Sequence, residues 1–199
     1  MRRLALIRHG QTDWNIQRRY QGWEGLDLNE IGRTQAREAA EHLLRLGATL
    51  GVEWRWLTSS TSPRAMQTAL IVGEHLGLVP HDLQHADLRE RGFGVAEGLL
   101  IVEARTRWPT REYPGGESVE AVLERALRGL DAVALAHLGL DGALVTHGTT
   151  LRLVVGHLTG EDPGSLPNGA VAVIEGEPGA WRTIVHPSGT TTSERAHTR

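Results

Sequence analysis

The chain of 199 residues contains neither cysteine nor lysine. Without cysteine there is no disulfide bond, no thiolate nucleophile and no cysteine-based zinc site. Without lysine there is no side-chain amine for covalent chemistry, and all 21 basic residues are arginines. Catalysis by this chain would therefore have to use histidine, carboxylate, hydroxyl or guanidinium groups.

Long hydrophobic runs are missing as well. The apolar run at residues 4–7 is too short for the core of a signal peptide. No stretch approaches the ~18 apolar residues that predict a membrane-spanning helix. The formal net charge of −3 offers no surplus of positive charge to a polyanion. These absences predict a soluble, cytoplasmic protein that has neither a membrane nor a nucleic acid as its partner.

The rest of the composition is typical of one globular domain. Hydrophobic residues make up 40% of the chain and charged residues 23%, enough for a core and a solvated surface. No linker or shift in composition divides residues 1–186, so we predict a single domain there. Residues 187–199 are polar and lack periodicity, which predicts a loose C-terminal tail.

Apolar segments alternate with helical patterns along the chain. Strands are predicted at residues 4–7, 52–57, 143–146 and 171–175, with a weaker one at 181–185. Helices are predicted over residues 28–47, 62–77, 117–139 and 149–160. The alternation predicts an α/β fold, a three-layer sandwich in which helices flank a mostly parallel central sheet.

Residues at the predicted helix ends support these limits. Asn29 is placed to cap the first helix, and Gly47 is placed to end it. Ser62 is placed to cap the second helix, with Pro63 at the first helical position, where proline is favoured. Ser118 begins the pattern of the third.

Polar residues follow three of the predicted strands, and in parallel sheets ligands bind just beyond the carboxyl ends of the strands. The first strand leads into Arg8, His9 and Gly10, the second is followed by Arg64, and the third by His147. Guanidinium forks and backbone amides at glycine turns suit the oxygens of a phosphate group. The sequence has no GxxxxGK[ST] loop and no cluster of aspartates for magnesium, so we expect neither a metal nor a cofactor.

A histidine can attack phosphorus if the attacking nitrogen carries no proton. Guanidinium groups beside His9 would lower its pKa and keep the ring neutral. The same charges would stabilise the negative charge that builds up on the phosphoryl oxygens in the transition state. A lone histidine at a strand end is more often a surface or core residue, so this interpretation depends on the other motifs.

The stretch ALIRHGQTDWN resembles the signature of the histidine phosphatase superfamily, which includes cofactor-dependent phosphoglycerate mutases and many small phosphatases. Further segments resemble the family's pattern in the expected order: RRYQGWEGLDLNEIGRTQA, SSTSPRAMQTA, LRERGFGVAEG, PGGES and VTHG. The resemblance covers roughly residues 3–175. It implies a phosphoglycerate mutase-like fold, often found as a homodimer.

The resemblance also implies roles for particular residues. His9 is the nucleophile and becomes a phosphohistidine, and Glu90 protonates the leaving oxygen and then activates water. Arg8, Arg64 and His147 complete the catalytic pocket. The implied substrate-binding residues are Thr12, Asn15, Gln21, Gly22 and Gly148. No residue is assigned to a metal.

Two departures from the family pattern and several rival interpretations remain. Ala96 stands where the family usually has a tryptophan, and Pro63 adjoins Arg64 without the usual spacer. Glu97 is the main rival to Glu90 as the acid, followed by Glu24 and Glu117. His81 and His85 have the spacing of a metal pair, but we expect a surface loop there. Trp23, Trp108 and Tyr113 are candidates for a wall of the substrate pocket.

Three functions fit the pattern: a phosphomonoesterase, a phosphoglycerate mutase and a binding protein with an inactive site. We favour a metal-independent phosphomonoesterase that hydrolyses a small phosphorylated metabolite. The alternative mutase would have a longer insertion after the acid and a pocket lysine, whereas here only the short segment 99–116 follows. That segment is expected to cap the pocket with Arg105, Arg107 and Arg111, which suit an anionic or ring-bearing leaving group. The substrate and the oligomeric state stay open.

Overall fold

The computed structural model describes residues 1–80 and 85–187. Its elements along the chain are β1 (Arg2–Arg8), α1 (Asp13–Ile16), α2 (Glu30–Leu50), β2 (Trp56–Ser59), α3 (Pro63–Leu76), two short 3-10 helices (Ala86–Leu88 and Gly94–Ala96), α4 (Ile101–Arg107), α5 (Val119–Ala136), β3 (Gly142–Thr146), α6 (Gly148–Thr159), β4 (Val171–Glu177) and β5 (Ala180–Val185). The predicted tail lies outside the described residues except for Pro187, and so does His81.

The five strands form one sheet in the order β2-β3-β1-β4-β5. The pairs β1–β3 and β2–β3 are parallel, whereas β1–β4 and β4–β5 are antiparallel. Four of the five strands therefore run in one direction, but the sheet is mixed, because the two-residue turn at residues 178–179 allows only antiparallel pairing of β4 with β5. The α/β class is confirmed, and the parallel part is the half that carries the predicted site residues.

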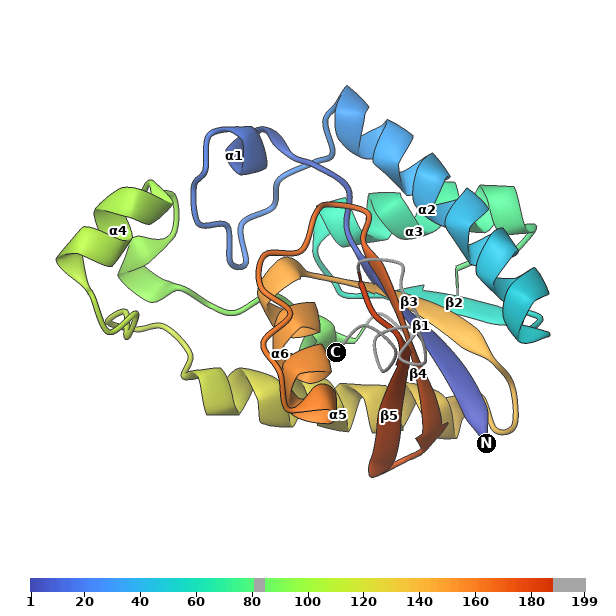
Figure 1. Ribbon diagram of the computed structural model, residues 1–199. Coiled ribbons are helices and arrows are strands. Elements are labelled where there is room, and N and C mark those ends of the chain that lie inside the picture. The colour runs from blue at the N-terminus through green and yellow to red at the C-terminus, as the bar shows by residue number, and fades with distance from the viewer. Residues whose placement is uncertain (81–84, 188–199) are drawn as a thin grey trace, which may run out of the picture.

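Helices cover both faces of the sheet (Figure 1). Alternate residues of β1 face opposite layers: Ala5 and Ile7 pack in the cluster that contains α2 and α3, and Leu4 and Leu6 pack in the one that contains α5 and α6. Each of these four side chains is almost fully buried, and burial of a leucine or isoleucine stabilises a fold by roughly 1.5–3 kcal/mol. The predicted three-layer sandwich is thus confirmed.

A smaller apolar cluster lies beyond one end of the sheet, where Figure 1 shows α1 and α4 standing apart from the other helices. Its buried members are Phe93, Ala96, Ala104 and Tyr113. Ala96, which replaces the family's tryptophan, is fully buried in this cluster. The cluster fixes α4 to the segment that follows Glu90.

The helix limits follow the predicted caps with one exception. The side chains of Asn29 and Ser118 accept hydrogen bonds from backbone amides and cap α2 and α5. Ser62 occupies the N-cap position of α3 without a side-chain capping bond, and Pro63 is the first helical residue. Gly47 does not end α2.

The helix α2 continues past Gly47 to Leu50 and ends at Gly51, whose φ of 65° suits a glycine. Gly47 has a packing role instead. A Cβ atom there would lie 2.8 Å from the carbonyl oxygen of Val52, so the returning chain can approach only a glycine. The prediction was wrong because a buried glycine and a terminal glycine look alike in a sequence.

Among residues 1–80 and 85–187, no helix combines the length and the apolar character needed to cross a membrane.

Candidate active site

The ends of β1 and β3 lie side by side and bring two histidines together. Arg8 pairs with Thr146 in the parallel register, and the amide of His9 donates to the carbonyl of Thr146 at 3.0 Å. The rings of His9 and His147 follow at once, with their centroids 5.1 Å apart. Residues 138 positions apart thus meet at one edge of the sheet because their strands are neighbours.

His9 is held as a neutral ring with one nitrogen available. His9 as a residue is only 2% exposed. Its Nδ1 lies 2.7 Å from the carbonyl oxygen of Gly10, which places the proton on Nδ1, so Nε2 is left to accept from Nε of Arg64 at 3.2 Å. Burial and then the charges of Arg64 and Arg8 hold the pKa of His9 well below its usual range, against the opposing effect of the Gly10 carbonyl. An unprotonated Nε2 is the form that can act as a nucleophile.

Arg64, in the first turn of α3, is fully buried. Besides His9, it donates to the carbonyls of Gln21, Gly22 and Glu24 at 3.1, 2.8 and 2.9 Å. Burial lowers the pKa of Arg64 to about 10, so the guanidinium stays charged at neutral pH. It therefore places a fixed positive charge beside Nε2 and ties the loop of residues 21–24 to the histidine.

His147, the N-cap residue of α6, is fully buried as well. Its Nε2 lies 2.8 Å from Oγ of Ser60, at the end of β2. Burial, followed by the charges of Arg64 and of the other groups around it, holds the pKa of His147 well below its usual range. The three strand ends thus contribute to one cluster of neutral imidazoles and charged arginines.

Three buried nitrogens in this cluster have no hydrogen-bond partner in the described part of the chain: Nε of Arg8, Nε2 of Gln21 and Nδ1 of His147. The Gln21 amide is oriented by Thr12, whose hydroxyl donates to Oε1 at 2.8 Å. Leaving a buried donor unpaired costs about 1–3 kcal/mol. Three such nitrogens around one histidine favour an acceptor-rich anion as the group that this site binds.

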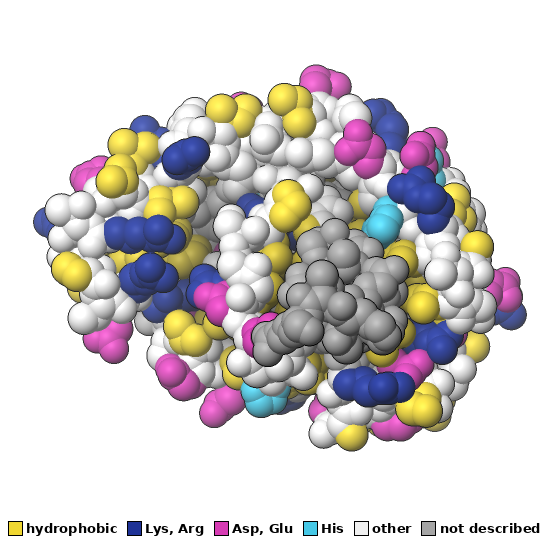
Figure 2. All heavy atoms as spheres, viewed as in Figure 1, with side chains coloured by type: hydrophobic (Ala, Val, Ile, Leu, Met, Phe, Trp, Pro, Cys, Tyr) yellow, Lys and Arg dark blue, Asp and Glu magenta, His cyan; other side chains and the backbone are white. Residues whose placement is uncertain are grey.

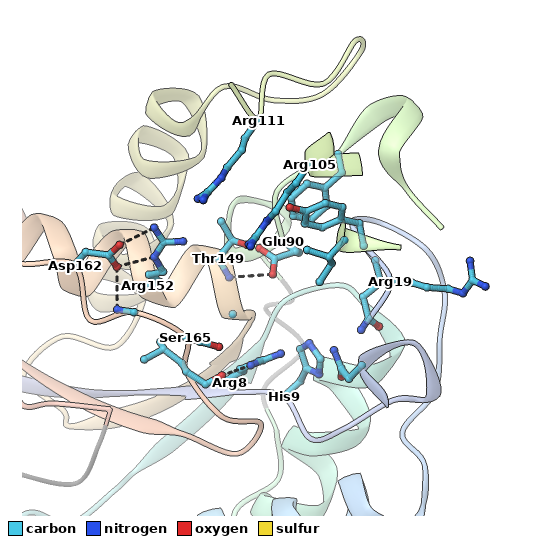
Figure 3. Close-up of a pocket in the computed structure, with 18 residues that line it drawn as sticks. Arg8, His9, Arg19, Glu90, Arg105, Arg111, Thr149, Arg152, Asp162 and Ser165 are labelled. Atoms are coloured by element: carbon cyan, nitrogen blue, oxygen red, sulfur yellow. Dashed lines mark hydrogen bonds and ion pairs between the residues drawn. The ribbon is translucent and has the colours of Figure 1, made fainter. Parts of the chain in front are cut away.

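Glu90 lies across the cleft from His9 (Figure 3). Glu90 as a residue is 7% exposed. It accepts from the amides of Thr149 at 3.0 Å and Thr150 at 3.3 Å, both in the first turn of α6, and from the amide of Arg91 at 2.9 Å. The N-terminus of a helix therefore fixes a carboxyl group opposite the histidine.

These groups line a cleft of about 390 Å³. Six of the predicted site residues contribute to its lining: Arg8, His9, Asn15, Gln21, Glu90 and Gly148. Arg64 and His147 lie behind His9 and contact it directly. A Cβ atom at Gly148 would lie 3.1 Å from the Arg8 guanidinium, so glycine there leaves room for that arginine.

Thr12 and Gly22 do not line the cleft. Thr12 is fully buried, caps α1 and orients Gln21, so it supports the site from behind. Gly22 contributes its carbonyl to Arg64. A Cβ atom at Gly22 would lie 2.1 Å from the carboxyl group of Glu97, which shows how closely that loop packs.

The rival carboxylates have other partners. Glu97 accepts from the amides of Phe93 at 3.0 Å and Trp23 at 3.3 Å. Glu117 forms an ion pair with Arg125 at 2.8 Å. Of Glu24, Glu90, Glu97 and Glu117, all of them in the described part of the chain, Glu90 alone lines the cleft.

The aromatic wall predicted from Trp23, Trp108 and Tyr113 is wrong, because none of the three lines the cleft. Trp23 donates to the carbonyl of Glu90 at 3.0 Å and contacts the guanidinium of Arg89. Trp108 and Tyr113 pack edge to face in the small cluster near α4. The aromatic residues that do line the cleft are Tyr20 and Phe93.

Sequence reasoning also missed one wall of the cleft. The loop between α6 and β4 contributes Asp162, Gly164, Ser165 and Leu166. Asp162 forms a bidentate ion pair with Arg152 of α6, at 2.7 and 2.8 Å. The antiparallel pairing of β4 with β1 could have indicated this wall, because β4 then begins at the edge where β1 and β3 end and the loop before it must return to that edge.

No group of three or more histidine and carboxylate side chains that could hold a metal occurs within residues 1–80 and 85–187. Of the predicted loop histidines, the described one is His85, which is half-buried and pairs through its backbone with Ser60.

The comparison with known proteins agrees with this geometry. A model of the histidine phosphatase superfamily (branch 1) matches residues 4–187. The chain belongs to the histidine phosphatase superfamily. Among its relatives, an uncharacterized phosphatase, PhoE, of Bacillus subtilis is 33% identical over 92% of either chain. A 2,3-bisphosphoglycerate-dependent phosphoglycerate mutase of Methylobacterium radiotolerans is 34% identical over 84% of either chain.

Solved structures of histidine phosphatases share the fold. A mycobacterial glucosyl-3-phosphoglycerate phosphatase in complex with VO3 superposes with a TM-score of 0.77 at 30% identity, over 92% of this chain and 97% of that one. The predicted phosphoglycerate mutase-like fold is thus confirmed. The relatives include both phosphatases and mutases, so membership of the superfamily does not by itself select the reaction.

Proposed function

We propose that the protein is a metal-independent phosphomonoesterase that hydrolyses a small phosphorylated metabolite through a phosphohistidine on His9. The observation that carries the proposal is the state of His9: a buried, neutral ring with its proton on Nδ1 and Nε2 facing a fixed guanidinium. The unpaired nitrogens of Arg8, Gln21 and His147 support the same proposal, because they suit the oxygens of a phosphoryl group.

In the first step, Nε2 of His9 attacks phosphorus and the P–O bond to the leaving group breaks. Glu90 donates its proton to the departing oxygen, so that an alcohol leaves. Arg8, Arg64, Gln21 and Asn15 stabilise the negative charge on the equatorial oxygens. If the hydroxyl of Ser60 donates to Nε2 of His147, the proton on Nδ1 of that ring adds one more donor.

In the second step, the Glu90 carboxylate takes a proton from water while the water oxygen attacks phosphorus. The P–N bond breaks, inorganic phosphate leaves, and His9 regains its lone pair. Glu90 ends protonated and ready for the next ester, so protons and electrons balance over the cycle.

A phosphoglycerate mutase is the second candidate, favoured by the mutase among the relatives. It would use the same phosphohistidine but return the phosphoryl group to the substrate. A mutase must keep water away from that intermediate. The chain has no lysine for the substrate pocket of a mutase, and only the short segment 99–116 follows Glu90. Hydrolysis is therefore the better fit.

A phosphatase assay tests the proposal. We expect release of phosphate from p-nitrophenyl phosphate and from small phosphorylated metabolites in the presence of EDTA. Rapid quenching should trap an acid-labile phosphoryl adduct that is absent in His9→Ala. Loss of activity on chelation would exclude the metal-free route, and isomerisation of 3-phosphoglycerate much faster than phosphate release would identify the mutase.

A further inference from the structure

Two arginines opposite the histidines form no hydrogen bond and no ion pair with residues 1–80 and 85–187. Arg105 lies near the end of α4 and Arg111 in the loop that follows, and both side chains are exposed. Figure 3 shows both pointing into the cleft, on the far side of Glu90 from His9. Neither guanidinium forms a hydrogen bond or an ion pair with any residue in the described ranges. Figure 2 shows basic side chains gathered over this part of the surface.

The cleft carries more positive charge than one phosphoryl group requires. Five arginines and two carboxylates line it. Arg152 is matched by its bidentate pair with Asp162, and Arg19 donates to Gln17 at 2.9 Å and to the carbonyl of Gly98 at 2.7 Å. Arg8 lies beside His9, where the phosphoryl group is proposed to bind. Arg105 and Arg111 remain without a hydrogen bond or ion pair in the described part of the chain, although the charge of Arg111 adds to the hydrogen bond from Arg152 in lowering the pKa of Asp162.

The backbone at Arg111 is held in a costly conformation. Its φ of 62° lies in the left-handed region, which is unfavourable for a residue other than glycine. The conformation is fixed from both sides: the amide of Arg111 donates to Trp108, and its carbonyl accepts from Nη2 of Arg91, each at 2.9 Å. The fold thus maintains an arginine where glycine would be less strained.

The position of Arg105 is fixed by the small apolar cluster. Ala104, its neighbour in α4, is fully buried there with Tyr113. The hydroxyl of Tyr113 donates to that of Tyr20 at 2.9 Å, and Tyr20 itself lines the cleft. Arg105 therefore projects from a packed helix beside the apolar side chains of Tyr20, Phe93 and Ile101.

We propose that the site selects phosphomonoesters whose leaving group carries a second anionic group, a carboxylate or a second phosphate, and that Arg105 and Arg111 bind this group. The proposal rests on the phosphomonoesterase function proposed above. The phosphoryl group would bind beside His9, the carbon skeleton would lie along Tyr20, Phe93 and Ile101, and the second anion would reach the two arginines. Guanidinium forks suit carboxylate and phosphate oxygens alike.

Matched substrates test the proposal. The pair 3-phosphoglycerate and glycerol 3-phosphate differs by a carboxylate, and the pair fructose 1,6-bisphosphate and fructose 6-phosphate differs by a second phosphate. We expect kcat/KM to be at least about tenfold higher for the doubly anionic member of one pair. The pair that shows the preference identifies the second group.

Variants assign the preference to residues. Arg105→Gln and Arg111→Gln should each reduce the ratio of kcat/KM within that pair by about tenfold. The control is Arg107→Gln, from the same helix, because Arg107 is exposed and lies against Trp108 rather than in the cleft. It should keep the wild-type ratio.

Arg111→Gly separates a binding role from a structural one. Glycine relieves the left-handed strain, so the thermal midpoint should stay or rise while the preference falls. A lower midpoint with the preference intact would overturn the assignment of Arg111.

The outcomes also separate the two proposals. Hydrolysis of p-nitrophenyl phosphate without a preference in either pair, or with a preference that survives in Arg105→Gln and Arg111→Gln, overturns this inference alone. Failure to hydrolyse any phosphomonoester, p-nitrophenyl phosphate included, overturns the proposed function and this inference with it.

Discussion

The chemistry of the site depends on the surroundings of single side chains. His9 and His147 are both buried among arginines, and their pKa values are lowered in consequence. Glu90 is different in that its carboxyl group is anchored by three backbone amides. In the proposed mechanism, the surroundings of His9 and Glu90 therefore suit the first to attack phosphorus and fix the second opposite it as the acid.

Arg64 is the residue whose removal should change the nucleophile most. Arg64→Gln takes away a charge that lowers the pKa of His9 and a donor beside the reacting phosphorus. We expect kcat to fall by about 10²–10³-fold. The acid limb of the kcat/KM profile should move to higher pH, because His9 then holds its proton more readily. The pH profile with p-nitrophenyl phosphate checks both effects.

An acid limb at the wild-type pH would show that burial and Arg8 lower the pKa of His9 without Arg64, and would contradict the role given to Arg64. Because Arg64 is buried and bonds three carbonyls, the thermal midpoint of the variant must be measured alongside, to separate misfolding from lost catalysis.

Glu90→Gln should separate substrates by their leaving group. An alkyl alcoholate needs a proton in order to leave, whereas p-nitrophenolate leaves without one. The variant should therefore lose about 10²–10⁴-fold in kcat/KM, which reports the first step and not the attack of water, on an alkyl phosphate and much less on p-nitrophenyl phosphate. Steady-state rates on the two esters check this. Equal losses of activity on the two esters would mean that another group is the acid. Glu97→Gln is the matched control, because Glu97 does not line the cleft.

At the scale of elements, the sequence predicted the order of strands and helices and the strand ends that carry Arg8, His9 and His147. These follow from local patterns and from the rule that links strand ends to ligand sites. Gly47 was misread because its role depends on Val52 packing against it. The wall at Asp162 and Ser165 was missed because it depends on the path of a loop toward an antiparallel strand, which no local pattern encodes.

The helix α5 fixes the segment that contains Glu90 through one residue, Arg125. Its five N–H donors reach the carbonyls of Asp87, Arg89 and Glu90 and both carboxyl oxygens of Glu117. Burial opposes ionisation of Glu117, but the hydrogen bonds from Arg125 and Gly92 outweigh it and lower the pKa of that carboxyl. The Glu117 of the PGGES motif thus has a structural role.

Arg125→Met should consequently destabilise the fold. The Arg125 side chain is 9% exposed and that of Glu117 is 21% exposed, so we expect a loss of about 3 kcal/mol, the lower end of the range for breaking a buried pair. Urea unfolding measures it. Arg128→Met is the control, because Arg128 lies on the same helix but its ion pair with Asp87 is largely exposed. Equal losses of stability in the two variants would contradict the structural role assigned to the hydrogen bonds of Arg125.

At the scale of the whole molecule, the two neutral histidines make the stability of the fold depend on pH. Both histidines of the site are buried without charge, and the unfolded chain would bind protons at these positions more readily. Since the pKa of each ring is lower in the folded state, its contribution to stability is complete above the usual histidine pKa of about 6.5 and declines as the pH falls below it. The site itself therefore makes the fold sensitive to mild acid.

We expect the free energy of unfolding to decrease between about pH 6.5 and 5, with each of the two histidines adding up to ~1.4 kcal/mol per pH unit. Urea unfolding at a series of pH values measures this slope. His147→Gln should reduce the slope by the contribution of one histidine, up to ~1.4 kcal/mol per pH unit. Ser60→Ala keeps both imidazoles and should keep the slope, while lowering stability at every pH by about 1 kcal/mol through the lost hydrogen bond to His147. A slope that His147→Gln leaves unchanged would mean that other groups bind the protons, and would contradict the neutral state assigned to this ring.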